Sequence, residues 1–203
     1  GLLAISLAIA AGALGLSALS VAGLRRWAAE RMLDIPNARS SHTRPTPRGG
    51  GLGIVISVLV GAWSLFISRI LSLSFREIAA LSLGGGIVAL VGWLDDIHRI
   101  PYRIRLAVQA ISSAIIIIAI DYYHTITVPF VGDIHLYSIG IPVALLWIMG
   151  LTNAYNFMDG IDGIAGGQAV VAGLGWMIIG LMGGQYFVSL LGVLLWASSL
   201  GFL

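Results

Sequence analysis

The sequence contains no cysteine and no lysine, and only 10% of its 203 residues are charged. Without cysteine, the chain can form no disulfides, thiolate metal sites or thiol redox motifs. Without lysine, all eleven basic residues are arginine. Soluble domains carry about 25% charged residues. The low charge, the 58% hydrophobic content and the mean hydropathy of +0.98 therefore indicate an integral membrane protein.

Apolar runs long enough to cross a bilayer as helices recur along the whole chain. We therefore expect an all-α fold, a polytopic membrane helix bundle that forms a single integral membrane domain over residues 1–203. About seven spans are predicted, at residues 2–24, 51–68, 78–97, 104–120, 138–155, 163–182 and 186–203. The chain starts at glycine and stops within an apolar run, so we expect an incomplete fragment of a longer protein.

Arginine is distributed unevenly between the two sides that these spans define. One side carries only Arg69 and Arg76, and the other carries Arg25, Arg26, Arg31, Arg39, Arg44, Arg48, Arg99, Arg103 and Arg105. Because arginine-rich loops stay in the cytoplasm, we assign the second side to the cytoplasmic face. On the outer side, residues 121–137 alternate around Gly132 and Asp133, which predicts a small β-hairpin. An irregular loop fits that segment nearly as well.

The most informative segment is 153–167, which holds two Asn and two Asp residues at the end of a predicted span. A charge at bilayer depth is costly, so an acid there indicates function. Asp159 and Asp162 are three residues apart and would share one face of a helix, as would Asn153 and Asn156. The alternative is a structural polar network inside the bundle, which rarely needs two Asp-Gly pairs.

Asp95 and Asp96 close the third predicted span. Neighbouring helical residues point about 100° apart, so the two acids are expected to have different tasks. The alternative is an interfacial acid pair balanced by Arg99, four residues after Asp95.

The third polar cluster lies in the loop 25–50, just before three consecutive glycines. Arginine binds phosphate through two parallel hydrogen bonds, and nearby hydroxyl and imidazole groups suit the same ligand. An ordinary positively charged cytoplasmic loop is the alternative. The candidate phosphate-binding residues here are Arg39, Ser41, His42 and Arg48.

All three clusters fall on the predicted cytoplasmic face. Oxygen ligands without cysteine or clustered histidine favour Mg²⁺ or Mn²⁺. Phosphoryl transfer depends mainly on positioning and on charge neutralisation by metal and arginine. The residues therefore indicate metal-assisted phosphoryl transfer between a nucleotide and a lipid, and they name neither substrate.

The same segments resemble the polyprenyl-phosphate N-acetylhexosamine-1-phosphate transferases, glycosyltransferase family 4. Residues 153–165 resemble the family signature Asn-x-x-Asn-x-x-Asp-Gly-x-Asp-Gly-x-Ala, and residues 94–96 resemble its aspartate-pair motif. The Pro-Thr-Pro-Arg-Gly-Gly-Gly run at 45–51 resembles the branch that initiates O-antigen, common-antigen or teichoic-acid linkage units. The resemblance also implies further spans, a metal-binding Asp and a sugar-recognition loop beyond Leu203.

The resemblance implies that undecaprenyl phosphate attacks a UDP-N-acetylhexosamine, giving undecaprenyl-diphosphate-sugar and UMP. Asp95 would activate or position the lipid phosphate, and Asp96 would organise the metal site or the polar substrate. Asp159 would be a catalytic residue and the ligand of Mg²⁺, with Mn²⁺ as an alternative. The substrate-binding residues would be Asn153, Asn156, Asp162, Arg39, Ser41, His42 and Arg48.

The implied location is the bacterial inner (plasma) membrane, with the active site on the cytoplasmic face. The implied partners are undecaprenyl phosphate and a UDP-N-acetyl sugar, not nucleic acid, and a homodimer is left open. UDP-GlcNAc is the usual donor, and a UDP-N-acetylated 6-deoxyhexose fits equally well. A transporter with a cytoplasmic-side ion site is one alternative. A CDP-alcohol-type phosphotransferase is another, although its Asp-Gly-x-x-Ala-Arg pattern is absent.

Overall fold

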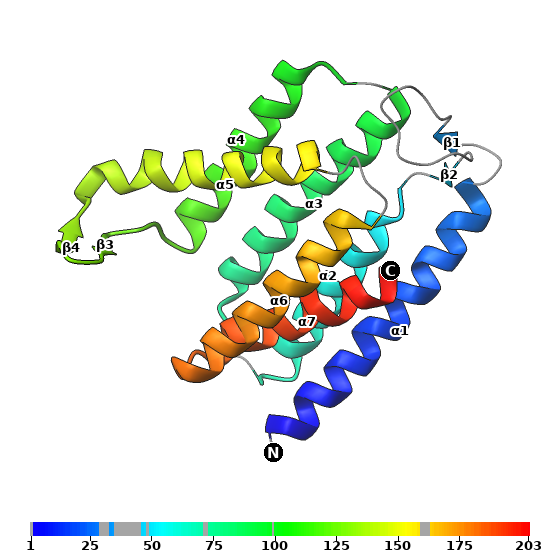
Figure 1. Cartoon of the computed structure of the whole chain (residues 1–203), viewed down its shortest axis with the longest axis horizontal. Coiled ribbons are helices and arrows are strands. Elements are labelled where there is room, and N and C mark those ends of the chain that lie inside the picture. Colours follow the sequence, from blue (N-terminus) through cyan, green and yellow to red (C-terminus); the bar gives the residue numbers. More distant parts are fainter. Residues whose placement is uncertain are drawn as a thin grey trace. The chain divides into compact units, whose positions relative to one another are not determined.

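The computed structural model describes residues 2–28, 33–34, 46–47, 49–70, 73–98, 100–158 and 163–203 (Figure 1). All seven predicted helices are present there, and their ends lie within a few residues of the expected positions. The helices are α1 (Leu2–Ala28), α2 (Gly51–Ile67), α3 (Phe75–His98), α4 (Tyr102–Ala119), α5 (Gly140–Met158), α6 (Ile164–Met182) and α7 (Tyr186–Phe202).

Five helical segments of the described chain are long and apolar enough to cross a membrane. They are Ala4–Arg26, Phe75–His98, Tyr102–Ala119, Tyr137–Met158 and Ile164–Met182. The two remaining helices, α2 and α7, are apolar but have 17 residues each, at the lower limit of the roughly 17–25 residues that span a bilayer. The all-α polytopic fold class is confirmed.

The chain divides into two compact units, one of residues 1–73 with 158–203 and the other of residues 74–157. Unit 1 contains α1, α2, α6 and α7, and α7 packs against each of the other three (Figure 1). Most of its buried side chains belong to α7, including Leu190, Leu194 and Ala197. A helix surrounded in this way has few sites for charged side chains, and α7 carries none, only apolar residues, three serines and a tyrosine.

Glycine lets the helices of unit 1 approach closely. A Cβ atom on Gly173 of α6 would lie 2.6 Å from the backbone nitrogen of Trp196 and 2.9 Å from the backbone oxygen of Gly192, both on α7. Backbone atoms cannot move aside as a flexible side chain can, so α6 and α7 tolerate only hydrogen at this point. Small residues at helix contacts are the usual means of packing in a membrane, where burial of apolar surface gives little driving force.

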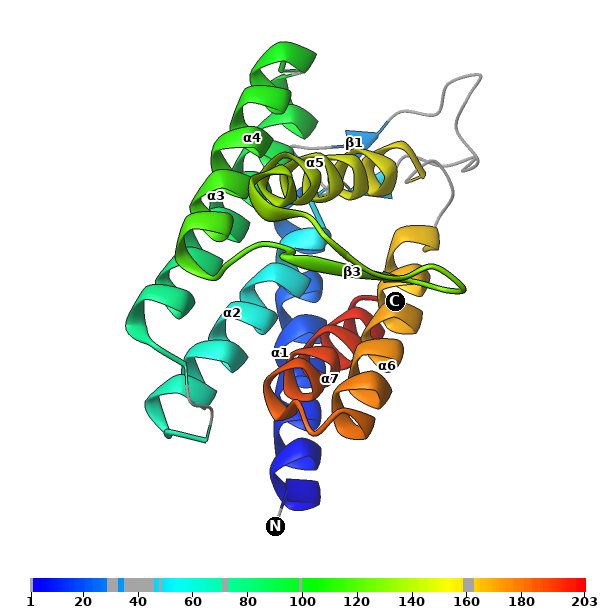
Figure 2. The same cartoon turned by 90° about the vertical axis from the view of Figure 1, so that its left-hand side faces the viewer.

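Unit 2 is built on α3 and α4, which lie side by side, while α5 crosses them (Figures 1 and 2). The Ser112 hydroxyl of α4 donates a hydrogen bond to the Gly84 carbonyl of α3 at 2.7 Å, and both residues are buried. The Arg76 guanidinium of α3 donates to the Ala119 carbonyl at 2.8 and 3.0 Å. The last-turn carbonyls of a helix have no partner within it, so Arg76 satisfies one that α4 leaves open.

The hairpin predicted within residues 121–137 is confirmed, with β3 (Thr125–Val128) paired to β4 (Gly132–His135) in antiparallel register. Its turn, however, occupies residues 129–131 rather than Gly132 and Asp133, which are the first residues of β4. Pro129 fixes the backbone φ angle at the second position of this turn, and Phe130 takes a φ of +70° at the third position. The Thr127 hydroxyl donates to the Asp133 carboxylate at 2.6 Å across the strands.

A second, two-residue antiparallel pair joins β1 (Leu33–Asp34) to β2 (Thr46–Pro47) in the loop between α1 and α2. No alternating pattern in the sequence predicts this pair.

Candidate active site

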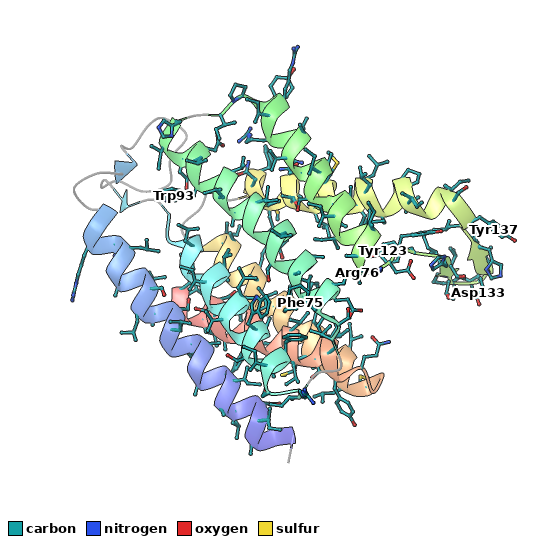
Figure 3. All side chains as sticks on the ribbon, turned by 180° about the vertical axis from the view of Figure 1, so that it is seen from behind. Phe75, Arg76, Trp93, Tyr123, Asp133 and Tyr137 are labelled. Atoms are coloured by element: carbon teal, nitrogen blue, oxygen red, sulfur yellow. The ribbon has the colours of Figure 1, made fainter. Side chains whose placement is uncertain are left out.

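Asp95 and Asp96 lie in the last turn of α3. Figure 3 shows the neighbouring Trp93 at the end of α3 opposite Phe75 and Arg76. The Asp95 side chain is 20% exposed, whereas Asp96 is an exposed residue. This difference agrees with the expectation that adjacent helical residues face different surroundings. The two carboxylates therefore differ in exposure, as their positions on the helix predict.

The partner of Asp95 is Arg105, in the first turn of α4. The guanidinium Nη1 lies 2.5 Å from a carboxylate oxygen, and the Arg105 side chain is 34% exposed. The sequence pointed instead to Arg99, which lies outside the described residues. Arg105 entered the prediction only as one of the cytoplasmic arginines, because ten residues and a helix break separate it from Asp95. The short connection between α3 and α4 brings the two side chains together.

Asn153 lies in α5 and contacts α4 through its side chain. Its amide nitrogen donates to the Gln109 side-chain oxygen at 2.6 Å and to the Met149 backbone carbonyl, one turn back, at 2.8 Å. Asn156 is one turn further along α5 and is exposed, as Asn153 is. Both asparagines are helical, as their spacing predicted.

Gln109 and Arg105 are four residues apart on α4, so they lie on one face of it. Together they connect α4 to α3 through Asp95 and to α5 through Asn153. We call these four residues, Asp95, Arg105, Gln109 and Asn153, the polar row. Through this row, α4 contacts one predicted catalytic residue, Asp95, and one predicted substrate-binding residue, Asn153. The row lies entirely within unit 2.

Reasoning from the sequence missed Gln109. The available signal was an amide inside a predicted span, where a polar side chain indicates either function or a partner. The sequence of α4 also holds Arg105 one turn earlier, so helical spacing alone would have placed the two polar groups together.

Several predicted site residues lie outside the described residues: Arg39, Ser41, His42, Arg48, Asp159 and Asp162. Among the described residues, no three side chains of the His, Cys, Asp or Glu types gather closely enough to hold a metal ion. The polar atoms available near the row are carboxylate and amide oxygens, which are the donors that Mg²⁺ prefers. The donor chemistry therefore fits that ion, although its predicted ligand Asp159 is not described.

Comparison with known proteins identifies the family. Residues 78–203 match the family model described as glycosyl transferase family 4. The chain belongs to this family. The matched range contains the whole polar row, whereas the arginine-rich loop 25–50 precedes it.

Three curated proteins illustrate what this glycosyl transferase family 4 chain is similar to. The Bacillus subtilis (strain 168) protein "Probable undecaprenyl-phosphate N-acetylglucosaminyl 1-phosphate transferase" is 32% identical over 84% of this chain and 47% of its own length. The Thermotoga maritima undecaprenyl-phosphate alpha-N-acetylglucosaminyl 1-phosphate transferase is 32% identical over 70% of this chain and 41% of its own. A Lactobacillus helveticus phospho-N-acetylmuramoyl-pentapeptide-transferase is 32% identical over 63% of this chain and 42% of its own length.

The chain spans about half the length of the curated relatives it matches. Membership of glycosyl transferase family 4 and the five apolar helical segments of the described residues indicate a multi-pass membrane protein.

Proposed function

We propose that the full-length protein that contains this chain transfers a sugar-1-phosphate from a UDP-N-acetylhexosamine to undecaprenyl phosphate. An oxygen of the lipid phosphate attacks the β-phosphorus of the donor. The bond from that phosphorus to the bridging oxygen breaks, and UMP leaves with the electron pair. The products are undecaprenyl-diphosphate-sugar and UMP. The observation that carries the proposal is the polar row, in which Asp95 of α3 and Asn153 of α5 both bind side chains of α4, within the range that matches the family.

In this proposal Asp95 positions or activates the lipid phosphate. The Arg105 guanidinium beside it supplies a positive charge, and arginine is well suited to a phosphate because its N–H groups form two parallel hydrogen bonds. Asp96 organises the metal site or the polar substrate. Such preorganised charges act mainly by stabilising the charge that develops on the transferring phosphoryl group.

The nucleotide sugar would be held by residues of α5 and of the segment that follows this helix. Asn153 and Asn156 lie on described helix, exposed and one turn apart. Asp159, as the metal ligand, and Asp162 would complete this side of the site. The arginine-rich loop would contribute further phosphate contacts through Arg39, Ser41, His42 and Arg48.

The proposed cofactor is Mg²⁺, with Mn²⁺ as a substitute. When bound, the ion would neutralise charge on the donor diphosphate. The oxygen-only donor chemistry of the described site supports this choice, since the sequence has no cysteine and the described residues form no histidine cluster that would favour a softer metal.

The proposed location is the bacterial inner membrane, with the site on the cytoplasmic face, where both a water-soluble nucleotide sugar and a lipid phosphate can reach it. The uneven arginine distribution supports this orientation. The proposed role is to start a cell-envelope polysaccharide, in the branch that initiates O-antigen, common-antigen or teichoic-acid synthesis. The Pro-Thr-Pro-Arg-Gly-Gly-Gly run at 45–51 favours that branch.

The test is UMP release by the full-length protein in detergent, with undecaprenyl phosphate, Mg²⁺ and a panel of UDP-N-acetyl sugars. We expect release that requires the lipid, stops with EDTA and is lost in Asp159→Asn. The sugar that supports turnover identifies the donor. Absence of release with every sugar, from protein that elutes as a single folded species, would contradict the proposal and favour another nucleotide donor or a transporter.

A further inference from the structure

The side-chain amide of Asn153 has a fixed orientation. Its nitrogen Nδ2 donates to the Gln109 Oε1 at 2.6 Å and to the Met149 backbone carbonyl at 2.8 Å. A backbone carbonyl can only accept a hydrogen bond. The nitrogen rather than the oxygen of the Asn153 amide must therefore face Met149, and the same group must then meet the oxygen of Gln109.

This orientation decides what Asn153 can offer to a ligand. An amide nitrogen carries two hydrogens, and these two bonds use both of them. The carbonyl oxygen Oδ1 is the remaining polar atom of the side chain, and it belongs to an exposed residue. An oxygen of this kind accepts hydrogen bonds or ligates a cation, and it repels a phosphate oxygen.

We propose that Gln109 is a positioning residue that holds the Asn153 amide so that its oxygen meets an electropositive group of the donor complex. That group is either an N–H or O–H of the nucleotide sugar or a divalent cation bound to its diphosphate. This inference rests on the proposed function and deepens it. It makes Asn153 a hydrogen-bond acceptor or cation ligand, rather than a residue that donates a hydrogen bond to phosphate. Without Gln109, only the bond to the Met149 carbonyl, among the described contacts, holds the amide, so the direction of its oxygen is less firmly fixed.

The placement of Gln109 supports a positioning role. Its side chain is partly buried on α4, a helix that is apolar apart from its first turns and its serines. A hydrogen bond between two side chains of different membrane helices fixes a rotamer as well as a helix contact. A methionine of similar size would fill the same space and replace the amide oxygen with a thioether sulfur, a much weaker acceptor, which makes the role of the oxygen testable.

The experiment compares Gln109→Met, which removes the amide oxygen, with Gln109→Glu, which keeps an oxygen there. The matched control is Gln185→Met, an exposed glutamine in the turn between α6 and α7. All are made in the full-length protein and assayed for lipid-dependent UMP release with UDP-GlcNAc and Mg²⁺. We expect kcat/KM to fall about tenfold in Gln109→Met, a typical coupling for contacting residues. It should stay within about threefold of the unmodified protein in Gln109→Glu and be unchanged in Gln185→Met.

Two further readouts separate positioning from general damage to the fold. In an Asn153→Ala background, Gln109→Met should cause no further loss, because there is no amide left to position. A rise in the half-saturating Mg²⁺ concentration in Gln109→Met would identify the cation as the group that Asn153 meets. A rise in KM for the donor at saturating Mg²⁺ would identify the sugar nucleotide.

Three results would overturn the inference while leaving the proposed function intact. They are an active protein in which Gln109→Met equals Gln185→Met, a Gln109→Glu variant as impaired as Gln109→Met, or full additivity with Asn153→Ala. Absence of both UMP release and UDP-GlcNAc binding in the unmodified protein would instead overturn the proposed function, and the inference with it.

Discussion

The two units of this chain are held together by different interactions. In unit 1, α7 meets its neighbours through glycine and serine, with helix backbones in close approach at Gly173. In unit 2, side chains connect the helices through hydrogen bonds and an ion pair, at Arg76, Arg105 and Gln109. Close backbone packing and interhelical hydrogen bonds both stabilise helix contacts in lipid. Apolar surface alone does not, because it interacts about equally well with lipid and with another helix.

The difference shows which polar groups are structural. The hydroxyls of Ser17, Ser198 and Ser199 in unit 1 are fully buried and have no hydrogen-bond partner among the described residues. There, serine serves as a small residue that permits close contact. In unit 2, by contrast, Asp95 and Asn153 are partly or fully exposed and each has a dedicated partner. Polar atoms that are both exposed and held in place are suited to binding a ligand.

The largest effect is expected on activity, from Asp95→Asn. The change keeps the shape of the side chain but removes the charge that faces Arg105. We expect kcat for lipid-dependent UMP release to fall by about 10²–10⁴-fold, the usual range for removal of an acid–base group. The matched control, Asp133→Asn in β4, removes an acid whose described partner is Thr127 and should leave kcat unchanged. Activity of Asp95→Asn within threefold of normal would remove Asp95 from the mechanism.

The next effect is on stability, from Gly173→Ala in unit 1. The new methyl group would press on the backbone of α7, and overpacking of this kind costs about 1–3 kcal/mol. Gly175→Ala in the same helix meets nothing within 4 Å, so it should be neutral or slightly stabilising. Thermal unfolding in detergent measures both. Equal melting temperatures for the two variants would show that α6 and α7 are not packed as closely as described.

A smaller loss of stability is expected from Arg76→Met in unit 2. The variant loses the hydrogen bonds that the guanidinium donates to the Ala119 and Ile118 carbonyls, which should cost about 1 kcal/mol for a partly exposed group. Hydrogen exchange should become faster in the last turn of α4. Arg69→Met, at an exposed position, is the control and should change neither quantity. Unchanged exchange in Arg76→Met would mean that the capping bonds do not stabilise α4.

The smallest effect concerns pH and Asp121, between α4 and the hairpin. The Tyr122 backbone N–H, at 2.8 Å, and the His124 ring, at 3.0 Å, hold the pKa of this carboxyl below its ordinary value of 3.8. Since the folded pKa is depressed, the contribution is complete above pH 3.8 and is lost as the pH falls through the folded pKa. When the pH is lowered from 6 to 3, the melting temperature of Asp121→Asn should therefore fall slightly less than that of the unmodified protein. A steeper decline in the variant would contradict this sign.

The helices were predictable from the sequence because each is encoded locally, by an apolar run between charged or glycine-containing breaks. The pairing of β3 with β4 was also predictable from alternation, but its turn was misplaced because Pro129 outweighed the Gly132-Asp133 pair in fixing the backbone. The pair β1–β2 has no such local pattern.

The candidate site was predictable in its acids and amides but not in their partners. Asp95 and Asn153 stood out because a polar group in a span is costly. Their partners Arg105 and Gln109 depend on how α4 lies against α3 and α5, which helical periodicity within one segment does not specify. The roles of Asp159, Asp162 and the residues of the arginine-rich loop lie outside the described residues and stay predictions.

The central claim is that the phosphoryl group travels with the sugar, and one isotope measurement tests it directly. The full-length protein is given UDP-GlcNAc labelled with ³²P at the β-phosphate, together with undecaprenyl phosphate and Mg²⁺. We predict that the label moves into the organic-extractable lipid while unlabelled UMP appears in equal amount. Label that stays in water-soluble UDP while the sugar reaches the lipid would contradict the account, because the protein would then transfer the sugar alone.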